Sequence, residues 1–370
     1  MSKTLLKYIL LIFLYKNSYA QSLEENYTSQ FQELIPFTNS YLNAFSHSFL
    51  VNAGFSLNHG WTYAIDPGKF GSIRVSLVTS SALIPNSGGY LNTDQIYQKP
   101  NLEISGLVAT IYGGKSTGIA SFYMLDPENG SRLLNPMNGE YIKGDFELPD
   151  GLGTNIGVTP IVIPEVEVGV GLGTSVSIRF LPLSIKIDKG NASISAYGFG
   201  IKHNLLQYIT SSSESGYHFN FFASYMHDKL KYVPNSGDLF EISGNYFNSQ
   251  GSELTIAHQS NAIQTVISGS YTKGKFFTIT AQAGASYQQS RLLSSGDLQI
   301  NILIPEISST IFSTHVPNLI HLVQSRWTPH IGAGVLVGSG AFQTSIQYAY
   351  INTHMLALGL HCQIYNVKER

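Results

Sequence analysis

Long stretches of the C-terminal half alternate between apolar residues and polar residues that carry no charge. From Phe277 to Gln288 the odd-numbered positions are apolar and the even-numbered ones are Thr, Gln, Gly or Ser. The same alternation returns over 342–350 and 356–364. A period of two places successive side chains on opposite faces of a β-strand. Each segment therefore predicts a strand with one apolar face and one polar, uncharged face.

The composition of the polar face favours a particular kind of β protein. Charged residues make up 12% of the 370 residues, with a net charge of −2, whereas soluble domains carry about 25%. A solvated sheet needs Lys, Glu and Arg on its outer face, while Gln, Ser and Thr suit an enclosed lumen. We predict a closed antiparallel transmembrane β-barrel, with a secreted β-sandwich adhesin as the alternative. The hydrophobic share of 43% argues against disorder, and the absence of a basic excess argues against nucleic-acid partners.

Strand length and strand ends agree with a membrane barrel. Spanning strands of about 10 residues end in aromatic girdles, and the aromatic residues near predicted strand ends are Tyr271, Phe276, Trp327, Tyr348, Tyr350 and Tyr365. Outer-membrane lipid is thus an expected partner. The candidate strands are 48–58, 71–82, 103–112, 164–171, 175–187, 194–204, 217–228, 254–272, 276–289, 298–304, 327–337, 341–351 and 355–365. They predict about 12 to 14 strands, an even number being usual.

The N-terminal region does not follow this pattern. Two lysines, a short apolar run and Ser18-Tyr19-Ala20 predict a signal peptide over 1–20, cleaved after Ala20, and hence a bacterial outer-membrane location. Apolar residues at helical spacing predict a helical segment over 21–46, broken at Pro36, that acts as a cap or a plug. The barrel then occupies 47–366, followed by a polar tail over 367–370.

A long stretch near 113–163, rich in Gly, Asn and Pro, interrupts the predicted barrel. We expect either an extracellular loop with a small hairpin at 118–124 or a segment folded into the lumen. Cys362 is the single cysteine and forms no intrachain disulfide.

A few charged residues fall within predicted strands, where a charge facing lipid costs about 2–4 kcal/mol. The candidate lumen or ligand-binding residues are Arg74, Glu167, Arg179, Lys186 and Lys202. A three-residue turn at 172–174 would place Glu167 opposite Arg179. One interpretation is a ladder of pairs that braces the wall. The other is a selectivity strip in which unpaired Arg74 and Lys202 attract an anionic head group.

The sequence carries no motif for catalysis or for a cofactor. No metal-binding His-Glu-x-x-His spacing and no Gly-x-Ser-x-Gly elbow is present. His258 with Ser260, and His203 with Asn204, are the pairs closest to a catalytic arrangement. We therefore expect no enzyme, no metal and no cofactor.

Several strand-and-turn motifs resemble a known family. These are Gly60-Trp61-Thr62-Tyr63, 71–76, 172–182 and 197–204. They are similar to an uncharacterised family of Bacteroidota outer-membrane β-barrel proteins that look like distant cousins of fatty-acid transporter barrels. The resemblance covers about residues 40–210.

The resemblance implies passive transport or binding of a small hydrophobic or amphipathic, or anionic, molecule, and insertion by the barrel-assembly machinery. Such barrels commonly end in an aromatic residue, whereas this chain ends in Arg370 and Tyr365 is its last aromatic residue. The alternatives are a non-transporting structural or interaction barrel of the cell surface and a lipid-modifying enzyme.

Overall fold

A computed structural model describes most of the chain. The described residues are 26, 28–61, 69–83, 89–96, 99–110, 113–135, 138–148, 150, 161–187, 190–208, 216–234, 243–244, 247–274, 276–304, 309–317, 320–339, 341–351 and 353–365. The predicted signal peptide and the predicted tail at 367–370 lie outside them.

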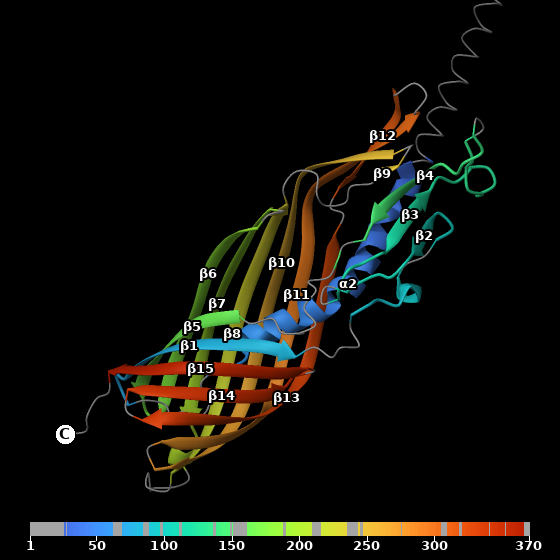
Figure 1. The fold of residues 1–370 in the computed structure, drawn as a ribbon. Coiled ribbons are helices and arrows are strands. Elements are labelled where there is room, and N and C mark those ends of the chain that lie inside the picture. The colour runs from blue at the N-terminus through green and yellow to red at the C-terminus, as the bar shows by residue number, and fades with distance from the viewer. Residues whose placement is uncertain are drawn as a thin grey trace, which may run out of the picture.

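The described chain contains a ten-stranded antiparallel ring (Figure 1). Each strand pairs with its neighbours, β1 pairs with the last strand, β15, and the pairing of β10 with β11 completes the circle. The prediction of a closed transmembrane-type barrel is confirmed. The strands of the ring are β1 (Ile73–Leu83), β5 (Ile161–Gly171), β6 (Thr174–Ile187), β7 (Gly190–Asn204), β8 (Tyr217–Pro234), β10 (Phe247–Lys273), β11 (Phe277–Ile304), β13 (His321–Ser339), β14 (Phe342–Tyr350) and β15 (His354–Tyr365).

The predicted count of 12 to 14 strands is wrong for three reasons. Residues 48–58 are helical, although their aromatic and branched residues suit a strand. Residues 103–112 contribute only the short β2 (Leu102–Ser105), which lies outside the ring. Residues 298–304 continue β11 rather than forming a new strand.

An apolar band encircles the outer face of the ring. On β11 it runs from Phe277 to Tyr287, which matches the 9–11 residues of a membrane-spanning strand. Aromatic pairs mark its two borders: Tyr217 with Tyr271, at a ring-centroid distance of 4.8 Å, and Tyr287 with Trp327, at 4.9 Å. Beyond the second border β10 and β11 continue with outward polar residues such as Gln259 and Arg291. The band thus has the height and the girdles of a bilayer-spanning wall.

A small extra-membrane unit, here called the cap, lies at the end where β10 and β11 extend. It contains η2 (Thr93–Gln95), β2, β3 (Ile119–Tyr123), β4 (Lys143–Glu147), β9 (Ser243–Gly244) and β12 (Ser309–Pro317). These strands continue the sheet beyond the ring. The long stretch near 113–163 therefore holds β3 and β4 of the cap before β5 begins. At the other end, η3 (Leu206–Tyr208) follows β7.

Helix α2 (Leu34–Asn58) joins the cap to the barrel interior, and Figure 1 shows it running obliquely from one into the other. Pro36 lies in its first turn, where a proline costs no helical hydrogen bond. The first half of α2 contributes Leu34, Phe37 and Tyr41 to the apolar core of the cap, against β2 to β4. The helix ends at Asn58, well beyond the expected 46. No described helix has both the length and the apolar character needed to cross a membrane.

The end of α2 and the residues after it fill the lumen. Eight strands enclose about enough room for their own side chains, so ten strands leave space for an additional segment. Phe55 packs on β1, β14 and β15, Leu57 on β5, β7, β8 and β10, and Trp61 on Phe222 and Val266. Residues 54–61, here called the plug, therefore touch the wall on several sides.

A closed ten-stranded ring predicts heat-modifiable migration on SDS gels. We expect unboiled protein from the membrane fraction to run faster than boiled protein, because the hydrogen-bonded ring resists unfolding by SDS. Identical migration of the two samples would contradict the barrel.

Candidate functional site: the plug and its charged anchor

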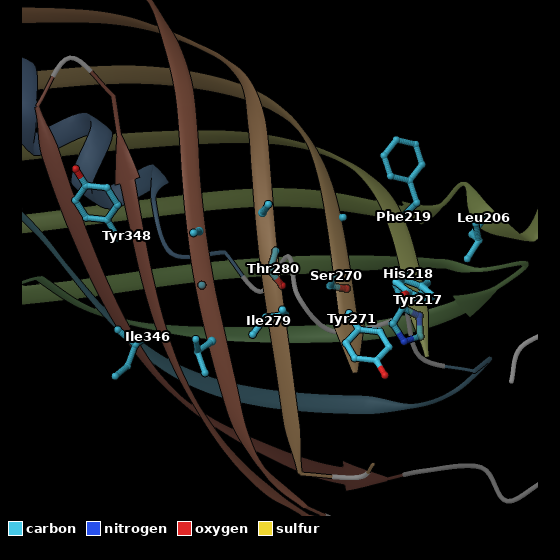
Figure 2. Close-up of a pocket in the computed structure, with 15 residues that line it drawn as sticks. Leu206, Tyr217, His218, Phe219, Ser270, Tyr271, Ile279, Thr280, Ile346 and Tyr348 are labelled. Carbon is cyan, nitrogen blue, oxygen red and sulfur yellow. The ribbon is translucent and has the colours of Figure 1, made fainter. Parts of the chain in front are cut away.

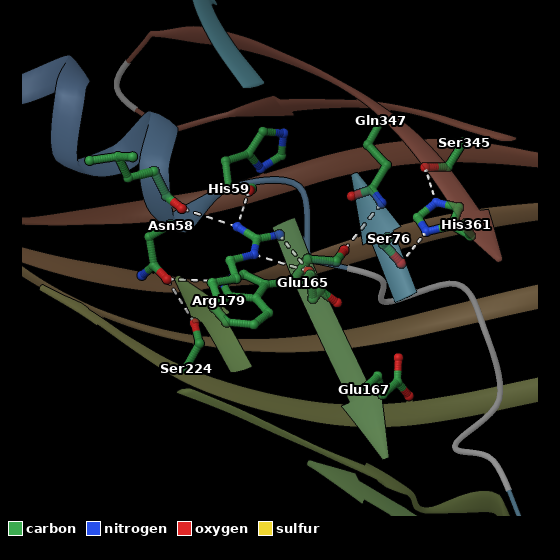
Figure 3. A network of polar contacts seen from close by, with 12 residues as sticks. Asn58, His59, Ser76, Glu165, Glu167, Arg179, Ser224, Ser345, Gln347 and His361 are labelled. Carbon is green, nitrogen blue, oxygen red and sulfur yellow. Dashed lines mark hydrogen bonds and ion pairs between the residues drawn. The ribbon is translucent and has the colours of Figure 1, made fainter. Parts of the chain in front are cut away.

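Arg179 ties the plug to the barrel wall. Its side chain, fully buried, extends inward from β6 and forms an ion pair with Glu165 of β5 at 2.9 Å. Its Nη1 donates hydrogen bonds to the backbone carbonyls of Leu57, at 3.0 Å, and His59, at 2.8 Å (Figure 3). These carbonyls belong to the end of α2, where helical partners run out. Arg179 therefore caps the helix and anchors it to the wall at once.

Trp61 occupies a socket built from the wall. The Arg179 guanidinium lies 3.8 Å from the centre of its ring, a cation–π contact, and Phe222 packs on it at 5.5 Å. A Cβ atom added at Gly198 or Gly200 would lie 3.4 or 3.2 Å from the indole. A Cβ atom would also clash with Met226 Sδ at Gly198 and with the Phe222 ring at Gly200, so the two glycines of β7 make room for the indole together with the side chains packed around it.

Polar contacts fix the backbone and neighbours of Trp61. The indole Nε1 donates to Asn58 Oδ1 at 3.0 Å, and Ser224 donates to the same oxygen at 3.0 Å. Gln347 of β14 donates to the Trp61 carbonyl at 3.1 Å. The plug is thus held from β6, β8 and β14 by side chains.

A second buried charge cluster lies beside the first. Glu167 of β5 pairs with Arg74 of β1 at 3.0 Å and with Lys202 of β7 at 2.8 Å, and it accepts a hydrogen bond from Ser175 at 2.6 Å. All four side chains are buried. Arg74 and Lys202 are therefore not the unpaired cations that the selectivity-strip interpretation requires.

The predicted register of the β5–β6 hairpin is wrong by two residues. Glu165, not Glu167, lies opposite Arg179, because a bulge between Gly169 and Gly171 and a two-residue turn replace the expected loop. The shift is even, so the inward and outward faces are as expected from the sequence. Lys186 is exposed near the end of β6 and is not part of the lumen clusters.

Apart from the buried pair of Asp228 and His258, the rest of the described lumen wall is mostly polar and uncharged. The His361 ring contacts the hydroxyls of Ser345 and Ser76, each at 2.8 Å (Figure 3). His330 contacts Gln264 and Gln282, and its ring lies 5.8 Å from that of His59 in the plug. The inward buried polar residues include Ser175, Ser177, Ser268, Ser270, Thr278, Thr280 and Ser286.

A trough of about 1180 Å³ lies on the outer, lipid-facing side of the wall (Figure 2). Gly269, Ala281 and Ala333, side by side on β10, β11 and β13, form its floor. Phe219 and Tyr348 flank this row. The depression arises because small residues replace large ones in one row of the band. In a membrane it is filled by acyl chains, and the wall separates it from the plug.

The described residues offer little for catalysis. They contain no group of three His, Cys, Asp or Glu side chains that could hold a metal. His258 pairs with Asp228 at 3.3 Å inside the barrel, and Ser260 is buried against Gly54 of the plug. The hydroxyl of Ser260 is thus covered by the helix, in contrast to an enzyme nucleophile at an open rim.

Several residues of the anchor were not predicted: Glu165, Asn58, His59 and Trp61. One signal was present, because glycine inside a strand indicates close approach of another part of the chain. Gly198 and Gly200 stand two apart on the inward face of β7, which indicates a bulky neighbour in the lumen. The identity of that neighbour depends on tertiary packing.

We expect Arg179→Met to lower the free energy of unfolding by about 3–5 kcal/mol, because Glu165 would remain buried without its partner. Lys186→Met is the matched control, since Lys186 lies on the same strand but is exposed, and should change stability by less than about 0.5 kcal/mol. Urea titration, followed by loss of the heat-modifiable band, measures both. Equal stability of the two variants would contradict the anchoring role of Arg179.

Solved outer-membrane barrels resemble the chain weakly. The translocator domain of the autotransporter NalP from Neisseria meningitidis is 10% identical, with a TM-score of 0.29, and the match covers 86% of this chain and 95% of that one. The Ralstonia pickettii toluene transporter TbuX is 8% identical, with a TM-score of 0.26 and coverage of 84% and 94%. A Pseudomonas aeruginosa FadL homologue is 7% identical, with a TM-score of 0.23 and coverage of 85% and 98%. These likenesses are too weak to transfer a function.

No curated protein matches the chain in sequence. A family profile does, and it extends far beyond the region of about 40–210 that carries the resemblance noted from the motifs. Since that profile matches residues 1–364, the chain belongs to the family of unknown function DUF6588.

Proposed function

We propose that this protein is an outer-membrane barrel that binds a small amphipathic molecule and passes it passively through a lumen closed at rest by the plug. The observation that carries the proposal is that the ring is complete without the plug. All ten strands pair with one another, and no strand pairing of the described chain involves residues 34–61. The plug can therefore leave the lumen without breaking any strand pairing of the ring.

The chemistry of the lumen supports an amphipathic ligand. Uncharged polar side chains line most of the wall, which suits a molecule that exchanges hydrogen bonds along its path. Apolar patches that the plug covers, at Ile163, Met226 and Phe222, suit an apolar portion of the ligand. The buried charges are paired with one another, so they brace the wall rather than attract ions.

The attachment of the plug supports movement at its lumenal end. Phe55, Leu57 and Trp61 are held by packing and by neutral side-chain hydrogen bonds of about 0.5–1.5 kcal/mol each. The bonds from Arg179 to the plug carbonyls contribute about 1.5–3 kcal/mol each. The first half of α2 is embedded in the cap core. Opening therefore requires displacement of the plug alone, with the cap end of the helix in place.

The cap favours a second candidate, a surface barrel that binds a partner macromolecule. It places the extensions of β10 and β11 and the five strands β2, β3, β4, β9 and β12 beyond the apolar band. In this case the plug is permanent and the barrel serves as an anchor.

We also propose an orientation. Outer-membrane barrels have short periplasmic turns and longer extracellular connections. At the end opposite the cap, only two residues separate β5 from β6 and β13 from β14, and three separate β10 from β11. The cap therefore faces outward from the cell, after export through a signal peptide that ends at Ala20.

The orientation predicts which positions an impermeant reagent reaches. In a Cys362→Ser background, we expect Lys115→Cys in the cap to react with a membrane-impermeant maleimide on intact cells. Lys273→Cys, an exposed control at the opposite end, should react only after permeabilisation. The reverse pattern would place the cap in the periplasm.

The plug predicts a conductance phenotype. In planar bilayers we expect wild-type protein to stay closed, and Phe55→Ala/Trp61→Ala to conduct, because two large side chains that fill the lumen are removed. Phe342→Ala is the matched control, since Phe342 is 72% exposed on the outer face. All variants must keep the heat-modifiable band. A folded double variant that stays closed would contradict the transport proposal and favour the surface-binding alternative.

A further inference from the structure

The upper part of β13 has a free edge that the helix α2 only partly covers. β14 pairs with β13 from Ile331 to Ser339, so 321–330 have no described strand on that side. Two asparagines of α2 face this edge instead. Asn39 accepts a hydrogen bond from the backbone N–H of His321 at 2.7 Å, and Asn43 contacts the side chain of Gln324. A gap in the wall is thereby bridged by a helix rather than by a strand.

A pocket of about 480 Å³, here called the edge pocket, lies where α2 meets this free edge. Five consecutive residues of β13, 322–326, line it from both faces of the strand, which is possible because no neighbouring strand covers the edge. The other lining residues are Asn43, His47, Gln288 and Ser290. The pocket therefore lies between α2, the inward face of β11 and both faces of β13.

The edge pocket carries a cation without a matching anion. Arg326 is exposed, none of the nine lining residues is acidic, and no described acidic side chain pairs with it. Partial burial, and then the positive charge of Arg326, lower the pKa of the His47 ring. Both effects disfavour a charged His47 ring, so Arg326 is the cation that the lining of the pocket presents to a ligand. Arg179 of the plug anchor and Arg74 of the second cluster, in contrast, are buried in ion pairs.

The position of Arg326 relative to the membrane is specific. Arg326 lies opposite Gln288, one row beyond the aromatic pair Trp327 and Tyr287 at the border of the apolar band. Trp327 is 70% exposed on the outer face. Aromatic girdles mark the level of lipid head groups. Arg326 shares the lumen-side face of β13 with Thr328 and His330, so an anionic head group there would sit inside the wall at the level of the interface. Leu322 and Val323, which line the same pocket, would be its apolar neighbours.

We propose that the edge pocket binds an amphiphile with a single anionic head group, such as a carboxylate or a phosphate ester, through the Arg326 guanidinium. The amides of Gln324 and Asn43 and the hydroxyl of Ser325 also line the pocket and can supply further polar contacts. This proposal rests on the proposed function, because it names the class of molecule that would be transported and the place where it would enter. Binding itself requires only the pocket.

The test uses the full chain folded in phosphatidylcholine nanodiscs, with octyl phosphate as the probe and calorimetry as the measurement. We expect wild-type protein to bind octyl phosphate and Arg326→Gln to bind it at least about tenfold more weakly, since a charge-assisted hydrogen bond is lost. Arg291→Gln is the matched control. Arg291 is also an exposed arginine beyond the apolar band, but it lies on β11 and does not line the pocket. Its substitution should leave the affinity unchanged.

Two further probes identify the source of the anion. Inorganic phosphate that binds as tightly as octyl phosphate would support the Arg326 site with a soluble anion as its ligand. Preference for octyl phosphate over both inorganic phosphate and octanol would support the site with a lipid-like amphiphile as its ligand.

Three results would overturn the proposal: no binding of either phosphate, equal affinity in wild-type protein and Arg326→Gln, or an equal loss in Arg291→Gln. The outcome is independent of conductance, because the pocket is present with the plug in place. If octyl phosphate binds but the plug variant does not conduct, the transport proposal is contradicted and the proposed binding site is still supported.

Discussion

The contacts of Arg179 join the barrel wall to the plug. A guanidinium buried inside a barrel is tolerable only with partners, because an unpaired charge there would cost several kcal/mol. The partners come from two unrelated parts of the chain, the Glu165 carboxylate in the wall and the carbonyls of Leu57 and His59 in the plug. The wall and the plug therefore stabilise each other. The Trp61 socket follows from the same contact, since the indole covers the guanidinium.

The sequence predicts the class of fold because the bilayer imposes a simple rule. Each spanning strand must present apolar side chains to lipid, so the faces of β11, β14 and β15 are apparent from alternation alone. Helical structure over 48–58 was not apparent from the sequence, because Phe49, Val51 and Phe55 are residue types that favour a strand. The limits of β11 were also missed. Beyond the bilayer the outward face becomes polar, so the rule no longer applies, although the strand continues.

The register of a strand pair is harder to predict than the face on which each side chain lies. Any even shift of a hairpin leaves the faces unchanged, so alternation cannot distinguish Glu165 from Glu167 as the partner of Arg179. The bulge at 169–171 and the positive φ of Leu172 decide the register, and neither is visible in the period. The pairing of Arg74 and Lys202 with Glu167 could not be predicted for the same reason, because it depends on the relative registers of the strands β1, β5 and β7.

The charges of the lumen also explain why a helix end, rather than a loop, closes it. The two clusters contain three cations, Arg74, Arg179 and Lys202, against two carboxylates, Glu165 and Glu167. The C-terminus of a helix carries a partial negative charge of about half an elementary charge. By directing the end of α2 at Arg179, the protein offsets much of this excess within the two clusters, while another buried carboxylate of the lumen, Asp228, pairs with His258 instead. A plug that withdraws must therefore leave Arg179 with an incomplete set of partners, and a ligand or water has to supply the missing acceptors while the lumen is open.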